Sequence, residues 1–131
     1  MLIALFGLLH AASPAWQPDY AAAAASAQKE GKNLFVFIST EDCRWCRKLE
    51  AFTLSDPAVA ERLNGAYASV HVTRDRDAYP AHLEAPVVPM CYFLLPDGTV
   101  IDFARGFWDT TDFNLILNDV DKRLKKIKET R

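Results

Sequence analysis

The chain has 131 residues, of which 50% are hydrophobic and 24% are charged, and this balance indicates one globular domain and excludes a disordered chain. Its formal net charge of −2 gives no electrostatic reason to expect a nucleic-acid partner. The three cysteines are too few for a disulfide scaffold, and two of them lie three positions apart, a spacing that suits a redox pair or half of a metal site.

Residues 1–15 form an apolar segment that we separate from a domain at 16–131. Residues 1–9 are apolar apart from one glycine, and small side chains at Ser13 and Ala15 fit a signal-peptidase site. No Lys or Arg precedes the run, so a helix packed on the domain is the alternative. The run is far shorter than the ~20 residues that span a bilayer, and we expect no membrane span. The segment predicts export to the periplasm, with a cytoplasmic location as the alternative.

The first half of the chain predicts a helix, a buried strand and an interrupted helix. Residues 18–31 are alanine-rich, open with proline and end at glycine, which is typical of a helix. The unbroken apolar run at 34–38 indicates a strand buried on both faces. After a polar turn, residues 44–52 carry apolar side chains at helical spacing, and Asp56-Pro57 begins a second helix that should end near 65.

The second half predicts a strand, a loop, a hairpin and a long helix. Residues 66–72 alternate in polarity as a strand does, and residues 73–87 contain two prolines and read as a loop. Strands at 90–95 and 99–105 flank a Pro-Asp-Gly turn, and the apolar spacing from 109 to about 128 is that of an amphipathic helix. This order predicts an α/β fold, a three-layer α/β/α sandwich with a central mixed four-stranded sheet, a C-terminal β-hairpin and a closing helix.

The two close cysteines lie where the buried strand gives way to a helix. Cys43 would begin that helix, where unpaired N–H groups and the positive end of the helix dipole stabilise a thiolate, and Arg44 would add positive charge. Cys46 lies one turn further on and would close a disulfide behind Cys43. A redox pair is favoured over an inert bridge. It is also favoured over zinc, which needs about four ligands, because His71 lies on a strand away from this helix. We therefore expect no metal and no cofactor.

These features together resemble the thioredoxin superfamily, and within it the exported thioredoxin-like proteins of bacteria. The resemblance implies thiol–disulfide exchange with protein substrates, and an upstream redox partner that the sequence does not identify. It also implies a cis Pro89 facing the cysteines, with the backbone of Val88 pairing with an extended substrate. The segments that carry the resemblance are 35–38, 42–50, 53–59, 88–90 and 96–98.

The chain departs from thioredoxins proper at two places. Thioredoxins carry a buried Asp six residues ahead of the first cysteine as a proton acceptor for the second, and Phe37 stands there in this chain. A nearby carboxylate would take over that task through water, or activation of Cys46 is slow; the candidates are Glu41, Asp42 and Glu50. Between the cysteines, Arg44-Trp45 replaces Gly-Pro, so we expect Trp45 to be an exposed aromatic contact for substrates.

The third cysteine and the direction of the reaction complete the predictions. Cys91 lies in the strand after Pro89, on the face that points into the core, so we interpret it as a buried packing residue, with a third redox thiol as the alternative. The predicted function is a protein thiol–disulfide oxidoreductase, with a reductant role preferred. The alternative is a binding or chaperone module of the same fold whose disulfide is static.

Overall fold

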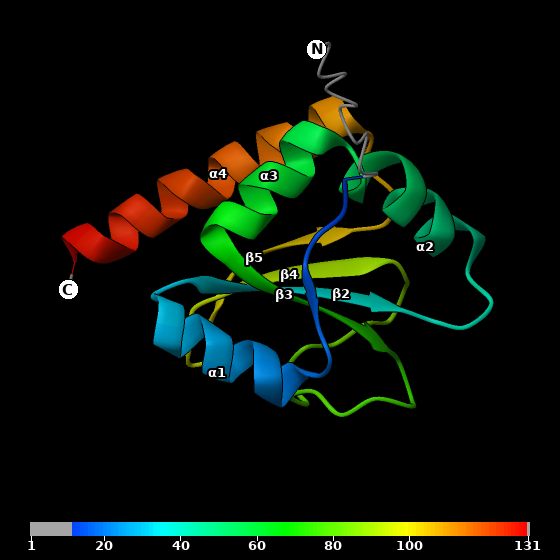
Figure 1. The fold of residues 1–131 in the computed structure, drawn as a ribbon, viewed down its shortest axis with the longest axis horizontal. Coiled ribbons are helices and arrows are strands. Elements are labelled where there is room, and N and C mark those ends of the chain that lie inside the picture. The colour runs from blue at the N-terminus through cyan, green and yellow to red at the C-terminus, as the bar shows by residue number, and fades with distance from the viewer. Residues whose placement is uncertain (1–11, 131) are drawn as a thin grey trace, which may run out of the picture.

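The centre of the molecule is a mixed sheet of five strands, seen in a computed structural model that describes residues 12–130 (Figure 1). The strand order is β1-β3-β2-β4-β5, with β1 and β2 parallel to β3, and with β4 antiparallel to both β2 and β5. The strands are β1 Trp16–Gln17, β2 Asn33–Ser39, β3 Tyr67–Thr73, β4 Met90–Leu94 and β5 Val100–Arg105.

The expectation of four strands is corrected by β1, which adds a fifth at the edge of the sheet. Trp16 and Gln17 pair in parallel with Ser69 and Val70 of β3. A strand of two residues is too short to show an alternating pattern, so its pairing with β3 is visible only in the folded chain. The other four strands lie where the sequence predicted them.

The helices begin and end at the residues that sequence punctuation marks. The side chains of Asp19, Asp56 and Asp109 accept hydrogen bonds from N–H groups in the first turns of α1, α3 and α4. Gly31 closes α1 with a φ of 66°, a conformation that glycine adopts without cost. The helical segments are α1 Tyr20–Glu30, α2 Arg44–Lys48, the π-helix η1 Leu49–Leu54, α3 Pro57–Ala66 and α4 Thr110–Glu129.

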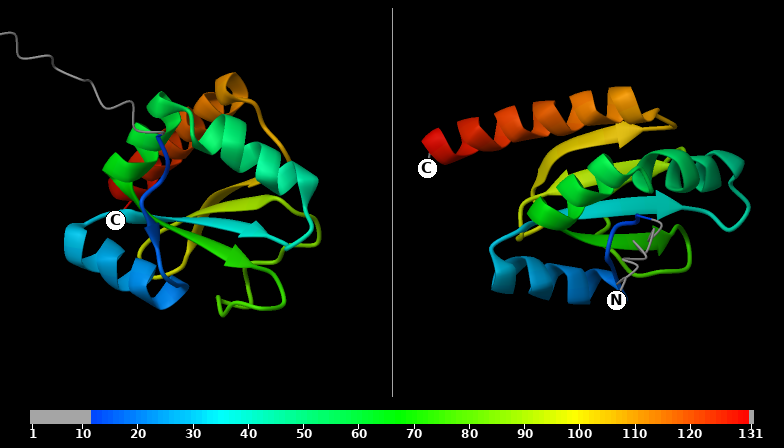
Figure 2. Two further views of the ribbon diagram at one scale, coloured as in Figure 1. Left: turned by 45° about the vertical axis from the view of Figure 1, so that its right-hand side comes forward. Right: turned by 45° about the horizontal axis from the view of Figure 1, so that its top comes forward.

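The helices cover the two faces of the sheet unequally and so create two cores. Figures 1 and 2 show α1 on one face, and α2, α3 and α4 on the other. Side chains of β2 alternate between these faces because successive residues of a strand point to opposite sides. Leu34, Val36 and Ile38 pack on the α1 side, whereas Phe35 and Phe37 pack on the other side with both cysteines of the pair.

The chain just ahead of β1 is held against α3. The Asn64 side chain accepts a hydrogen bond from the Ala15 N–H at 2.7 Å and donates one to the Ser13 carbonyl at 3.1 Å, while Pro14 is buried. Most of the predicted export segment, residues 1–11, lies outside the described residues. Within 12–130, none of the helices has the length and apolar character needed to cross a bilayer.

Candidate active site

The two cysteines of the pair form a disulfide at the start of α2. Cys43 is the N-cap of this helix, and its sulfur accepts a hydrogen bond from the Cys46 N–H at 3.1 Å. The bond Cys43–Cys46 joins residues whose Cα atoms are 5.2 Å apart. Cys43 is 8% exposed and Cys46 is 3% exposed, so Cys43 is the more accessible of the two. This is the arrangement in which one thiol meets a substrate and the other lies behind it.

Positive charge surrounds the accessible sulfur. Arg44, Arg47 and Lys48 all lie on α2 and are all exposed, and Arg47 is 4.0 Å from the carboxylate of Asp42. The N–H groups of the first helical turn point towards Cys43, as the hydrogen bond from Cys46 illustrates. Both effects favour a thiolate at Cys43 once the disulfide is reduced.

A shallow groove of about 360 Å³ lies beside the disulfide and brings together three separate parts of the chain. The Val88–Pro89 peptide bond is cis, and the Pro89 carbonyl accepts a hydrogen bond from the Gly106 N–H at 2.8 Å. Gly106 has a φ of 82°, which favours glycine and lets the chain turn out of β5 towards Phe107. The groove is lined by Trp45, Val88, Pro89, Gly106 and Phe107.

Trp45 forms one wall of this groove and is held in place from two sides. It is 50% exposed, its ring centroid lies 5.7 Å from that of Phe107, and the Lys48 ammonium lies 4.8 Å from the Trp45 ring centroid. The same ammonium is 5.2 Å from the Phe107 ring, so one cation joins both aromatic residues. Sequence reasoning identified Trp45, but it missed Phe107 and the position of the Lys48 ammonium over both rings. The only available signal was that Gly106-Phe107 directly follows the last hairpin strand.

Of the three carboxylates proposed to replace the missing buried Asp, only one is suitably placed. Glu41 is exposed and forms an ion pair with Arg76 at 2.8 Å, and Asp42 is exposed beside Arg47. Glu50 is half-buried, lies one helical turn after Cys46, and its carboxylate has no hydrogen bond or ion pair with any other residue in 12–130. Glu50 therefore remains the best candidate among them.

His71 lies on β3, a strand apart from the motif helix as expected, but beside the strand that leads into that helix. The parallel pairing of β2 and β3 places it directly beside Phe37, and the two rings stack with centroids 4.4 Å apart. Phe37 packs in the same core as Cys43 and Cys46, so His71 borders that core through its contact with Phe37. The contact of His71 with Phe37 follows from strand register, which no local pattern specifies.

Cys91 is a buried free thiol in the centre of β4. It is paired in register with Phe37 on one side and Ala104 on the other, in the core that also holds the disulfide. Burial raises the pKa of the Cys91 thiol far above its usual value, so this thiol stays protonated. These features fit the expected packing role.

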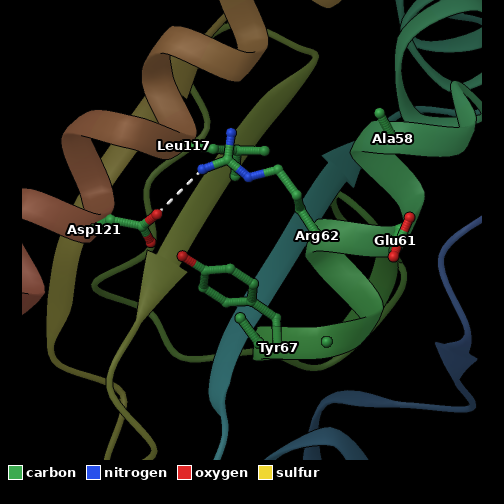
Figure 3. Close-up of a pocket in the computed structure, with 8 residues that line it drawn as sticks. Ala58, Glu61, Arg62, Tyr67, Leu117 and Asp121 are labelled. Carbon is green, nitrogen blue, oxygen red and sulfur yellow. Dashed lines mark hydrogen bonds and ion pairs between the residues drawn. The ribbon is translucent and has the colours of Figure 1, made fainter.

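A second hollow, of about 510 Å³, shares no residue with the disulfide groove. It lies between α3 and α4, where Arg62 forms an ion pair with Asp121 at 3.1 Å and the ring of Tyr67 points towards them (Figure 3). In the described part of the chain, no three His, Cys, Asp or Glu side chains are grouped as metal ligands would be.

Comparison with known proteins places this geometry in context. A family model described as thioredoxin-like matches residues 15–96, whereas none of the curated proteins matches the chain. A thioredoxin from Thermus thermophilus is 25% identical, with a TM-score of 0.68 over 84% of this chain and 86% of that chain.

Two further solved structures share the fold at 18% identity. The oxidoreductase DsbH has a TM-score of 0.67 over 95% of this chain and 94% of its own. The C-terminal domain of DsbD from Neisseria meningitidis, in its oxidised form, has a TM-score of 0.59 over 76% of this chain and 90% of its own. The fold and the cysteine pair together support thiol–disulfide oxidoreductase chemistry in general.

Proposed function

Because this chain belongs to the thioredoxin-like family, we propose that it is an exported reductant of protein disulfides that works through Cys43 and Cys46. The observation that carries the proposal is the disulfide at the start of α2, with its more accessible sulfur at the N-cap position. The partners are then protein substrates with disulfides and an upstream thiol donor that returns the pair to its reduced form.

The reaction proceeds in two exchange steps. The Cys43 thiolate attacks one sulfur of a substrate disulfide, forms a mixed disulfide, and releases the other substrate sulfur as a thiolate. The Cys46 thiol then loses its proton and attacks the Cys43 sulfur, which forms the Cys43–Cys46 bond and releases the second substrate sulfur. The substrate disulfide gains two electrons, and the Cys43–Cys46 pair loses these two electrons.

The groove beside the disulfide is proposed as the substrate site. The backbone N–H and C=O of Val88 make no hydrogen bond to another residue in 12–130, and Val88 precedes the cis Pro89, so an extended substrate segment could pair with them. Trp45 and Phe107 would supply apolar contact around the scissile bond. Glu50 is the carboxylate proposed to assist Cys46.

Two further points concern the direction of the reaction and the location of the protein in the cell. The cationic surroundings of Cys43 stabilise the reduced thiolate and so move the potential towards that of an oxidant, while the family resemblance favours a reductant. Equilibration with a glutathione redox buffer measures this potential directly. Export rests on the apolar segment at 1–15, and fractionation of cells that express the full chain tests it.

The deciding experiment compares two serine variants in an insulin reduction assay driven by dithiothreitol. Cys43→Ser should abolish insulin precipitation above background, because no nucleophile remains. Cys46→Ser should attack but not resolve, so mixed disulfides should accumulate on a non-reducing gel. If the unaltered protein gives no activity above background and Cys46→Ser traps nothing, the disulfide is static and the protein is a binding module.

A further inference from the structure

The hydrogen-bonded pair Ser39–His71 has no role in the two exchange steps as written above. The Ser39 Oγ and the His71 Nε2 are 2.6 Å apart, Ser39 is buried and His71 is half-buried. On its other side, the imidazole ring stacks on Phe37 and also contacts Trp16 at a centroid distance of 5.7 Å. The fold therefore holds the His71 imidazole in one position, with a hydrogen bond to Ser39 and aromatic rings packed against it.

We propose that His71, held by Ser39 and stacked on Phe37, is the proton acceptor that serves Cys46 through Glu50 or water when the mixed disulfide is resolved. The inference rests on the proposed function and adds a positioning residue to it. Phe37 stands on β2 where thioredoxins have a buried carboxylate. The residue paired with Phe37 on β3 is His71, whose imidazole can act as a base in place of that carboxylate.

Strand register and packing link His71 to the region of Cys46, because His71 pairs with Phe37 and Phe37 packs in the core that holds Cys46. Glu50 follows Cys46 by one helical turn, and the Glu50 carboxylate acts on the imidazole by raising its pKa. Burial is the larger effect and lowers the pKa of His71, so the ring is neutral near pH 7 and can accept a proton. The other charged groups that act on the ring are Asp77, which raises its pKa, and Arg76, which lowers it.

The imidazole also has a route to solvent. His71 and Val72 border a small hollow of about 230 Å³, because β1 ends opposite Val70 and leaves this part of β3 at the sheet edge. The titratable side chains around that hollow are Asp19, Tyr20 and Asp77. Because His71 is only half-buried and borders this hollow, a proton on its imidazole can pass to water.

The proposed step balances as follows. The Cys46 thiol gives its proton, through Glu50 or water, to the neutral imidazole, and the resulting thiolate attacks the Cys43 sulfur of the mixed disulfide. The Cys43–Cys46 bond forms, the bond from Cys43 to the substrate sulfur breaks, and the substrate leaves as a thiolate. The imidazolium then returns its proton to water through the hollow bordered by Val72.

The test isolates the resolving step with Ellman's reagent, which releases one thionitrobenzoate on attack by Cys43 and a second on attack by Cys46. In stopped flow, His71→Gln should slow the second release at pH 7 by at least about tenfold and leave the first unchanged. Its pH profile should lose an inflection that the unaltered protein shows below pH 7. Glu50→Gln should keep that inflection and move it to lower pH, because the Glu50 carboxylate raises the pKa of His71. The control His82→Gln makes the same change at a histidine that is hydrogen-bonded to Gly98, and it should behave as the unaltered protein.

A second measurement uses the unaltered protein and does not depend on any variant folding. If His71 and Cys46 share a proton, NMR titration of the His71 ring should give different pKa values in the oxidised and reduced protein. Identical titration of His71 in both states overturns the proposal, as does an unchanged second release in a folded His71→Gln protein. Either result leaves insulin reduction intact, so it is distinguishable from failure of the proposed function.

Discussion

Replacing Tyr67 with phenylalanine should make the protein more stable, because the hydroxyl that it removes is buried and unpaired. Tyr67 is 4% exposed, and its hydroxyl has no hydrogen-bond partner within residues 12–130. Burial, and then the negative charge of Asp121, raise the pKa of the Tyr67 phenol, so it stays neutral. Its ring packs against Phe93 with centroids 5.7 Å apart, a contact that phenylalanine keeps.

The magnitude follows from the cost of an unpaired polar group. Burying a hydroxyl without a partner costs about 1–3 kcal/mol, judged from substitutions in proteins. The Tyr67 ring lines the same hollow as Arg62 and Asp121 (Figure 3), so we use the lower end of this range. We therefore expect Tyr67→Phe to raise the free energy of unfolding by about 1 kcal/mol, or about 3–5 °C in Tm for a domain of this size.

The same substitution at Tyr92 should have the opposite effect on the free energy of unfolding. Its hydroxyl donates a hydrogen bond to the Glu84 carbonyl, so Tyr92→Phe should lower the free energy of unfolding by about 1 kcal/mol. Urea unfolding of the oxidised proteins, followed by circular dichroism, measures both values. If Tyr67→Phe loses as much stability as Tyr92→Phe, the Tyr67 hydroxyl is paired in solution and the reasoning is refuted.

Three further predictions concern the site and its core. Arg44→Glu should raise the pKa of the Cys43 thiol in the reduced protein and make the disulfide less oxidising, because it replaces a positive charge near the thiolate with a negative one; alkylation rates measure this change. The distant Lys122→Glu should leave both properties unchanged. Cys91→Ala should leave insulin reduction intact and lower the free energy of unfolding by about 1 kcal/mol; lost activity would show that the redox pair is incomplete. Burial lowers the pKa of His71 below 6.5, so its stabilising contribution is present above that pH and is lost as pH falls through the folded-state value. The loss of unfolding free energy on acidification should therefore be smaller in His71→Gln than in the unaltered protein.

The sequence by itself determined the elements whose signals are local. A proline or aspartate at a helix start, the glycine at position 31 and the apolar run at 34–38 each act within a few residues, and the structure has the expected elements there. The pair Cys43–Cys46 was recognisable for the same reason, since a buried strand followed directly by a helix places both cysteines without reference to distant parts of the chain.

Only the tertiary structure decided which distant residues meet at this site. The pairing of β1 with β3, the approach of Phe107 to Trp45, and the stacking of His71 on Phe37 each join segments more than 30 residues apart in sequence. Register and crossover set these contacts, and a shift of one residue would turn His71 to the other face of the sheet. A local sequence pattern shows that a segment is a strand, but it does not show which strand will lie beside it. For this reason the cysteine pair was predicted from the sequence, and the residues that surround the pair were not.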